Sequence, residues 1–342
     1  LYFLTGWGIT AGYHRLFSHK SFEAHWSVRA ALLLFAAMSM QGSCKWWSKK
    51  HRAHHKFTDT SKDPYAVAKS FFHAHIGWML WKTNARTHAD VSDLEADPLC
   101  RFQHKYYPHL VVIAGVILPW LFCGYFFDDY MGGFFFAVIA RITFVHQSTF
   151  FVNSLAHYLG TQTYSEMHSA VDSLITALVT LGQGFHNYHH TFANDYRNGI
   201  KWYHWDPTKW LILSLYHLGL VWDLKFATDL EIQKCRVEVA LGRVTGQKNV
   251  LAYGPNLDGP ALPEWTALTL SAECAAGKKL VILAGKIYDI SSFVEQHPGG
   301  RFVLERCVGK DVTSLFRGEE DKNHIHSAFA VGLLKRFIVA RL

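Results

Sequence analysis

Twenty-two histidines stand out among the 342 residues, and eight of them fall into three compact clusters. The clusters lie at 14–19, 51–55 and 186–190 and have the patterns H-x4-H, H-x2-H-H and H-x2-H-H. In the last two patterns the spacing i, i+3, i+4 places all three imidazoles on one face of a helix. Neutral imidazole binds iron, zinc and copper well. The eight residues are His14, His19, His51, His54, His55, His186, His189 and His190.

Eight histidines exceed the needs of one metal ion, so the clusters predict two metals. Soluble di-iron proteins use Glu-x-x-His pairs on a helix bundle, and the sequence contains no such pair. The predicted centre is therefore almost wholly histidine. Isolated histidines are interpreted as ordinary surface or core residues, including His73, His75, His146, His204 and His217.

The composition favours a membrane surface over nucleic acid. Half of the residues are apolar, 15% are aromatic, and the net charge is +7. In this apolar background the positive charge fits a membrane surface, and no nucleic-acid partner is expected. The six cysteines are widely spaced and form no C-x-x-C pair. We therefore expect free thiols in a reducing compartment.

Two apolar segments, 109–127 and 132–155, are long enough to span a bilayer, which needs roughly 20 residues. They form a hairpin whose tip, 127–130, has no Lys or Arg, whereas the flanks outside the hairpin are basic. The positive-inside rule then predicts a lumenal tip and cytosolic histidine clusters. The apolar start, up to Tyr13, is too short to span and is expected to be the end of a longer spanning helix.

Segment 28–44 decides the topology. If it spanned the membrane, the first two histidine clusters would lie on opposite sides and could not share a metal site. We therefore expect a helix in the membrane interface or buried in protein. Segment 205–224 is predicted to be a second interfacial helix. Residues 1–241 are predicted to form a membrane domain, and 264–342 a small polar domain. The Gly- and Pro-rich stretch 242–263 is expected to be a linker.

The histidine clusters and their surroundings resemble the membrane fatty acid desaturase family. The segments 8–19, 51–56 and 184–190, together with Asp63-Pro64 and Gly77-Trp78, are similar to those of acyl-CoA delta-9 desaturases. The resemblance covers about residues 1–225. Front-end desaturases usually have Gln as the first residue of the third cluster and an N-terminal b5 domain, and this chain departs from both features.

The resemblance implies a transmembrane helical bundle with a cytosolic cap formed by the histidine clusters. It implies an endoplasmic reticulum enzyme that introduces a cis double bond into fatty acyl-CoA, using O2 and two iron ions. It also implies a ninth histidine ligand, His157, and a metal contact through water from Asn153. Gln41, Trp47 and Thr149 match the residues that hold the bend of the acyl chain in this family. Lys49, Lys82 and Arg86 could contact CoA phosphates or anionic lipid.

The segment Val294–Gly300, with His297 at its centre, resembles the first haem-binding motif of cytochrome b5. The segment from His326 to Ala330 resembles the motif around the second ligand, although His324 lies nearby and stays open. We therefore predict a small α+β cytochrome b5-like domain that holds haem b between His297 and His326, as in fungal-like fused desaturases. Two histidine axial ligands suit electron transfer. The implied electron source is NADH-cytochrome b5 reductase.

Two other functions remain possible from the sequence. Membrane hydroxylases and other lipid oxidases also use histidine clusters, and the products, an alcohol or an alkene, would distinguish them. A membrane-anchored b5 electron carrier with vestigial clusters is the non-enzymatic alternative. A ratio of two non-haem irons to one haem would exclude that carrier.

Overall fold

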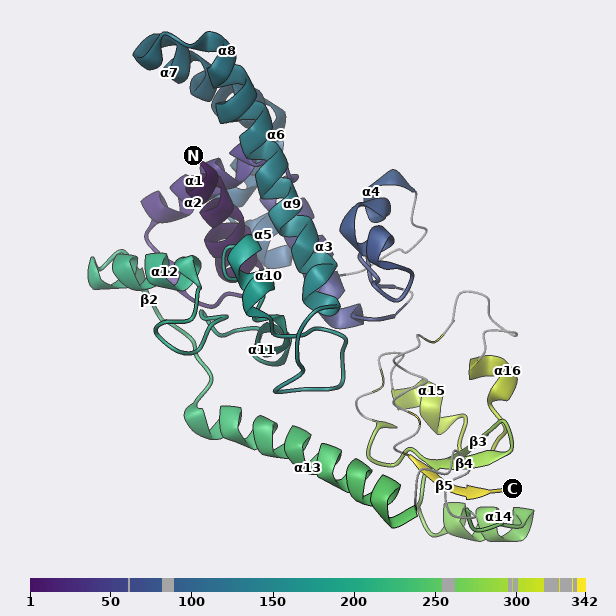
Figure 1. Cartoon of the computed structure of the whole chain (residues 1–342). Helices are drawn as coiled ribbons and strands as arrows, with labels where there is room; N and C mark the ends of the chain where they lie inside the picture. Colours follow the sequence, from purple (N-terminus) through teal and green to yellow (C-terminus); the bar gives the residue numbers. More distant parts are fainter. Residues whose placement is uncertain are drawn as a thin grey trace.

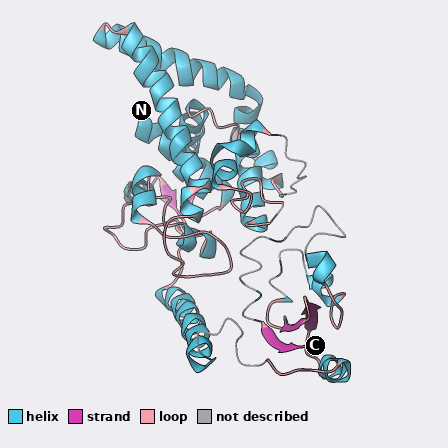
Figure 2. Cartoon of the chain, turned by 45° about the vertical axis from the view of Figure 1, so that its right-hand side comes forward, coloured by secondary structure: helices cyan, strands magenta, loops and turns pink. Residues whose placement is uncertain are grey.

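The computed structural model describes residues 1–60, 62–81, 89–253, 262–294, 297, 301–316, 326, 334 and 337–342. These residues are mostly helical, and a small three-stranded sheet follows the long helix α13 (Figures 1 and 2). The elements before the hairpin are α1 (Tyr2–Trp7), η1 (Gly8–Ser18), β1 (Glu23–Ala24), α2 (Trp26–Met38), α3 (Cys44–Phe57), η2 (His73–Gly77), α4 (Trp78–Leu80) and α5 (Ser92–Ala96). Two continuous helical rods and a series of shorter helices follow them.

The two rods are long and apolar enough to cross a membrane, as the sequence predicted. The first, Pro98–Phe127, consists of α6 (Pro98–Leu110), η3 (Val111–Ile117) and α7 (Leu118–Phe127). The second, Tyr130–His157, consists of α8 (Tyr130–Gly132), η4 (Gly133–Ala140), α9 (Arg141–Asn153) and η5 (Leu155–His157). With 30 and 28 residues and a rise of about 1.5 Å per residue, each exceeds the roughly 30 Å of a hydrocarbon core.

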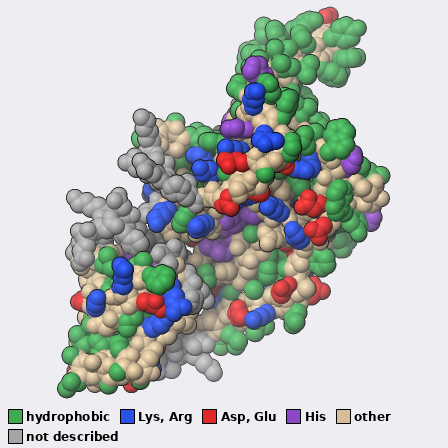
Figure 3. All heavy atoms as spheres, turned by 180° about the vertical axis from the view of Figure 1, so that it is seen from behind, with side chains coloured by type: hydrophobic (Ala, Val, Ile, Leu, Met, Phe, Trp, Pro, Cys, Tyr) green, Lys and Arg blue, Asp and Glu red, His purple; other side chains and the backbone are tan. Residues whose placement is uncertain are grey.

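The tip of the hairpin is set by two aspartates. Asp128 ends α7 with a left-handed backbone (φ 52°), and the Asp129 carboxylate accepts a hydrogen bond from the Gly132 amide at 2.7 Å to begin α8. Asp is well suited to both positions because its short polar side chain can bond to nearby backbone. Hydrophobic side chains cover the projecting end of the hairpin (Figure 3). This surface fits lipid better than water.

Helix α2 is too short to span a bilayer, which agrees with the prediction for segment 28–44. It has 13 residues, and six of them are buried. Its axis approaches η1 closely, because a Cβ on Gly8 would lie 2.2 Å from the amide nitrogen of Ala36. The buried guanidinium of Arg141 donates to the carbonyls of Met38 and Gly115 at 2.7 and 2.6 Å. Arg141 thus joins the end of α2 to both rods.

The second predicted interfacial helix, 205–224, is only partly correct. Helix α12 covers Pro207–His217, and Gly219 then adopts a left-handed φ of 71° that ends it. Strand β2 (Val221–Trp222) follows and pairs antiparallel with β1. Between the second rod and α12 lie α10 (Leu174–Val179) and α11 (His186–Thr191), and the latter carries the third histidine cluster.

The first half of the predicted linker 242–263 is helical. Helix α13 runs from Asp229 to Tyr253, so it passes through Gly242 and Gly246. Each glycine costs a helix only about 1 kcal/mol relative to alanine, and Ala240, Leu241 and Arg243 beside Gly242 are good helix formers. Residues 254–261 lie outside the described part of the chain. Near its start α13 is held by Ile232, which is buried against Tyr164 and Tyr188.

The small C-terminal part is built on an antiparallel sheet in the order β3-β4-β5. Its strands are β3 (Leu280–Leu283), β4 (Lys286–Asp289) and β5 (Ile338–Arg341), and its helices are α14 (Ala267–Ala275), α15 (Arg301–Glu305) and α16 (Thr313–Phe316). Alternate residues of β3 face opposite sides: Leu280 and Ile282 pack with Leu270 of α14, whereas Val281 packs with Val294. The sheet thus has an apolar core on each face.

Candidate metal centre and haem site

The first histidine cluster lies on a π-helix, which explains its spacing. In η1 the amide of His19 donates to the carbonyl of His14 at 3.1 Å, the i to i+5 bond of a π-helix. On an α-helix, residues five apart point in different directions, whereas one π-helical turn brings them to the same side. The ring centroids of His14 and His19 lie 5.0 Å apart. The H-x4-H pattern therefore presents both rings to one point.

The second and third clusters lie on α3 and α11. Ser43 caps the start of α3, because its hydroxyl accepts from the Trp46 amide. Both clusters are divided in the same way. Contrary to the expectation of one convergent face, His54 points to a different group of ligands from His51 and His55. In α11, His189 likewise separates from the other two histidines of its cluster.

Nine histidines form two groups in which the candidate ligand atoms all lie within 4.8 Å of one another. The five-histidine group consists of His14, His19, His51, His55 and His189. The four-histidine group consists of His54, His157, His186 and His190. Each group draws on different elements, so neither could form from one cluster alone. All eight clustered histidines and His157 are included.

The spacing of the ring nitrogens fits metal ions. In the five-histidine group the Nε2 atoms of His19 and His51 are 2.8 Å apart, and those of His14 and His189 are 2.9 Å apart. In the four-histidine group the Nε2 atoms of His186 and His190 are 3.1 Å apart. Two nitrogens bound at right angles to one metal at about 2.1 Å would be separated by about 3 Å. The family whose motifs these are implies iron.

Burial keeps most of these imidazoles neutral, with a lone pair free to bind metal. It lowers the pKa values of His14, His51 and His189 well below the usual range, and neighbouring histidines lower them further. The pKa of His19 falls to about 3 through burial and the cations Arg52 and Arg15. These shifts favour coordination over protonation.

His54 differs from the other clustered histidines. Burial lowers its pKa, but the nearby carboxylate of Asp63 outweighs that effect, so its pKa is raised. The His54 Nδ1 atom lies 2.9 Å from the Asp63 Oδ1 atom. The sequence placed Asp63 in a family motif without assigning it a contact. Asp63 lies only nine residues after His54 in the sequence, and this proximity was the one sequence feature that could have indicated the contact.

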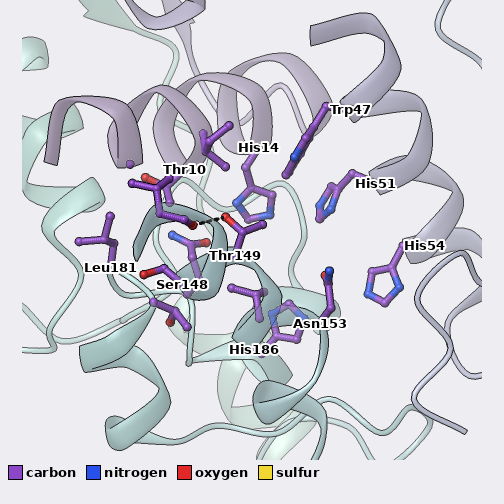
Figure 4. Close-up of a pocket in the computed structure, with 16 residues that line it drawn as sticks. Thr10, His14, Trp47, His51, His54, Ser148, Thr149, Asn153, Leu181 and His186 are labelled. Atoms are coloured by element: carbon purple, nitrogen blue, oxygen red, sulfur yellow. Dashed lines mark hydrogen bonds between the residues drawn. The ribbon is translucent and has the colours of Figure 1, made fainter. Parts of the chain in front are cut away.

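A partly open cavity adjoins both groups. His14, His51, His54 and His186 lie along one side of it, and Thr10, Ser148 and Leu181 lie toward the other (Figure 4). Asn153 also lines the cavity, close to the histidines. Residues that the sequence did not single out complete the wall: Gly6, Ile9, Val145, Val152, Thr180 and Gln183. The mostly apolar wall suits an alkyl chain.

Three of the six predicted substrate residues come together at this cavity. Trp47 and Thr149 line it, and Gln41 donates a hydrogen bond to the Thr149 hydroxyl at 2.9 Å. The Trp47 ring stacks on His51 at a centroid distance of 4.9 Å. Lys49 is exposed on α3. Lys82 and Arg86 lie outside the described residues.

The haem-ligand candidates face each other in the C-terminal part. The ring centroids of His297 and His326 are 6.4 Å apart, which leaves room for one metal bonded at about 2.0–2.1 Å to a nitrogen of each ring. The His326 Nδ1 atom lies 3.0 Å from the Phe316 carbonyl oxygen. In haem ligation the other ring nitrogen, Nε2, would bind the iron. His324, the alternative ligand, lies outside the described residues.

Comparisons with known proteins divide the chain into a desaturase part and a cytochrome b5-like part. Residues 1–223 match the model of the fatty acid desaturase family, and residues 266–342 match the cytochrome b5-like heme/steroid binding domain. The chain is 42% identical to "Acyl-CoA desaturase 1" of Saccharomyces cerevisiae over 93% of its own length and 62% of that protein. It is 42% identical to the "Probable acyl-CoA desaturase" of Schizosaccharomyces pombe over 99% of its length and 70% of that protein.

Human "Stearoyl-CoA desaturase 5" is 37% identical over 69% of this chain and 74% of the relative. The chain spans less than two thirds of the length of the Saccharomyces relative. It spans 70% of the Schizosaccharomyces relative and 74% of the human relative. The family match covers more than half of the chain and includes the three histidine clusters and His157. This chain belongs to the fatty acid desaturase family and carries a cytochrome b5-like domain after the desaturase segment.

Proposed function

We propose that this protein is an O2-dependent fatty acyl-CoA delta-9 desaturase that receives its electrons through the fused b5 haem. One observation carries the proposal: nine imidazoles form two metal-sized groups at the side of an apolar cavity. The names of the yeast and human relatives add support, since all are acyl-CoA or stearoyl-CoA desaturases. Desaturation of a methylene pair needs a strong oxidant, which side chains cannot supply.

Two iron ions bound by these histidines would supply that oxidising chemistry with O2. The protein's own residues do the rest. The histidines, with Asn153 through water, would hold the metals, and the cavity wall would exclude water and position the alkyl chain. The hydrogen bond from Gln41 to Thr149 fixes one side of the cavity, and the stacked Trp47 ring limits movement on the other. Together they could hold a bend in the chain beside the metal ligands.

The membrane arrangement belongs to the same proposal. The two rods would cross the endoplasmic reticulum membrane, with the acidic tip 127–130 in the lumen and both metal groups at the cytosolic face. At that face the CoA phosphates would contact Lys49. They would also contact Lys82 and Arg86, which lie outside the described residues. The desaturase domain would comprise 1–241 and the haem domain 264–342. Helix α13 then forms the first half of their connection.

Electrons would pass from NADH-cytochrome b5 reductase to haem b, held by His297 and His326, and then to the metal centre. Each desaturation needs two electrons, and a b5 haem carries one at a time, so the haem domain must act twice per turnover. Covalent attachment keeps the donor at high effective concentration. Helix α13 is held to the desaturase part by Arg236, which donates to the Tyr164 hydroxyl at 3.0 Å.

The test is expression in a yeast strain that lacks its own desaturase, followed by fatty acid profiling. We expect fatty acids with a cis double bond at carbon 9. His54→Ala and His189→Ala, one from each metal group, should abolish them while leaving the haem spectrum intact. Hydroxylated products would instead identify a hydroxylase. Full activity in either variant, or a purified protein with haem but no non-haem iron, would contradict the proposal.

A further inference from the structure

The two metal groups differ in the charges behind them. Two buried aspartates, Asp59 and Asp63, stand behind the four-histidine group. The five-histidine group instead has two arginines as its charged neighbours, Arg15 and Arg52. This difference has consequences for how tightly each group holds its metal, because a carboxylate behind a ligand strengthens a metal–imidazole bond and a cation weakens it.

The contact between Asp63 and His54 is buried, and backbone amides hold the Asp63 carboxylate in place. Both side chains are at most 4% exposed, and the Nδ1 to Oδ1 distance is 2.9 Å. The Asp63 carboxylate also accepts from the amides of Tyr65 and Asp59, at 2.9 and 3.3 Å. These backbone donors fix the carboxylate, so His54 must keep its proton on Nδ1. Its Nε2 lone pair is then directed to the metal.

A second carboxylate reaches His157 through a serine. The Ser169 hydroxyl lies 2.8 Å from Nδ1 of His157 and donates a short hydrogen bond to Asp59, while the Ser169 amide donates to the same carboxylate at 2.6 Å. Because the hydroxyl proton points to Asp59, the Ser169 oxygen is left to accept from His157. The buried Nε2 atom of His157 has no hydrogen-bond partner. It is the atom available to the metal.

The five-histidine group has no such support in the part of the chain that the structure describes. None of its ring nitrogens is within hydrogen-bonding distance of a carboxylate there. Arg15 is paired with Asp206, and Arg52 with Asp93, so these carboxylates bond the arginines and not the ligands. Arg52 also donates to the carbonyl of Phe17 at 2.7 Å, next to the first cluster.

We propose that Asp63 and the Asp59–Ser169 pair are positioning residues that make the four-histidine group the tighter of the two metal sites. The proposal rests on the proposed function, since it takes both groups to bind iron. It assigns the residues two effects. Asp63 adds negative charge behind His54, and Ser169 fixes the His157 tautomer. Loss of such outer contacts typically weakens metal binding by about 10–100-fold.

The test measures iron binding rather than turnover. The full-length protein is depleted of non-haem iron with a chelator and titrated anaerobically with ⁵⁷Fe(II), and each site is followed by Mössbauer spectroscopy. His186→Ala, which removes a ligand of the four-histidine group, identifies the signal of that group. In the unmodified protein this signal should appear first. Asp63→Asn and Ser169→Ala should each weaken it about 10–100-fold and leave the other signal unchanged.

Asp93→Asn is the matched control, because it makes the same change at a carboxylate that contacts an arginine and no ligand. It should leave the filling order unchanged. The haem spectrum reports folding of the b5 part, and size-exclusion behaviour reports the rest. If Asp63→Asn does not fold, Ser169→Ala decides. Simultaneous filling of both sites in the unmodified protein, or variants that bind like Asp93→Asn, would overturn the inference. A protein that binds no non-haem iron at all would overturn the proposed function as well.

Discussion

Replacement of Asp206 by asparagine should destabilise the desaturase part strongly. The Asp206 side chain is fully buried, and its two oxygens accept from the Arg15 guanidinium at 2.8 and 3.2 Å. They also accept from the amides of Asn198, Gly199 and Lys209 at 2.9, 3.2 and 3.0 Å. Asparagine keeps the size and can still cap α12. The substitution thus removes the charge and leaves Arg15 buried without it.

The expected magnitude follows from the burial of both partners, which are at most 1% exposed. Removing one member of a buried ion pair costs about 3–5 kcal/mol. For a domain of this size, about 1 kcal/mol lowers the melting temperature by roughly 2–4 °C, so the loss should be about 6–20 °C. Asp206→Ala should lose about 1 kcal/mol more, because the α12 cap also disappears.

The assay is thermal unfolding in detergent, followed by the loss of the monodisperse chromatography peak. Asp223→Asn is the control, since its ion pair with Lys225 at 3.9 Å is exposed on both sides and should be worth less than about 1 kcal/mol. Because Arg15 adjoins His14, the Asp206 variant should also lose non-haem iron. A melting temperature within about 2 °C of the unmodified protein would refute the reasoning.

Three further predictions follow from other contacts. His326→Ala should abolish the b5 absorption spectrum and stop turnover, and added soluble cytochrome b5 should partly restore turnover; a retained spectrum would point to His324. Thr149→Val removes the acceptor of the Gln41 bond and should change double-bond position or chain-length preference more than iron content, as measured by product profiling. Burial lowers the pKa of Lys209 to about 8, so between about pH 8 and 10.5 the unfolded chain binds more protons and stability should rise with pH. Lys209→Met should remove that rise in melting curves across this range.

The gathering of the histidines could be predicted from the sequence, but their division into two groups could not. The i, i+3, i+4 spacing places His51, His54 and His55 on one broad face of α3. That face looks toward both α11 and η1, so each imidazole meets a different neighbour. Which ring joins which group depends on how three helices are rotated about their axes. No local pattern encodes that rotation.

The contacts of Asp63, Asp59 and Ser169 with the ligand histidines were still harder to predict. Asp63 is close to His54 in the chain, but Ser169 and Asp59 are 110 residues apart. A lone serine in a loop gives no sequence signal, and only the fold brings it to His157. The structure also brings His168 close to the four-histidine group, because its ring centroid lies 5.1 Å from that of His190. An isolated histidine of this kind is indistinguishable in sequence from a surface residue.

The helical first half of the predicted linker has a different cause. The Gly- and Pro-rich composition of 242–263 predicted irregular structure, yet a single glycine such as Gly242 lowers helix stability by only about 1 kcal/mol. The segment between Ile232 and Arg243 has tertiary contacts that offset this cost. Arg243 forms an ion pair with Glu166 at 2.8 Å, and Ile232 is buried. Composition alone cannot reveal such contacts.

The contacts of α13 extend to the helix that carries the third histidine cluster. Arg236 and Arg243 of α13 bond to the loop that contains Tyr164 and Glu166. The amides of Thr163 and Tyr164 donate to the Asn187 side chain, which lies between two metal-ligating candidates in α11. A displacement of α13 would therefore act on the third histidine cluster through one short chain of hydrogen bonds. The position of α13 and that of the third histidine cluster are for this reason linked through Tyr164 and Asn187.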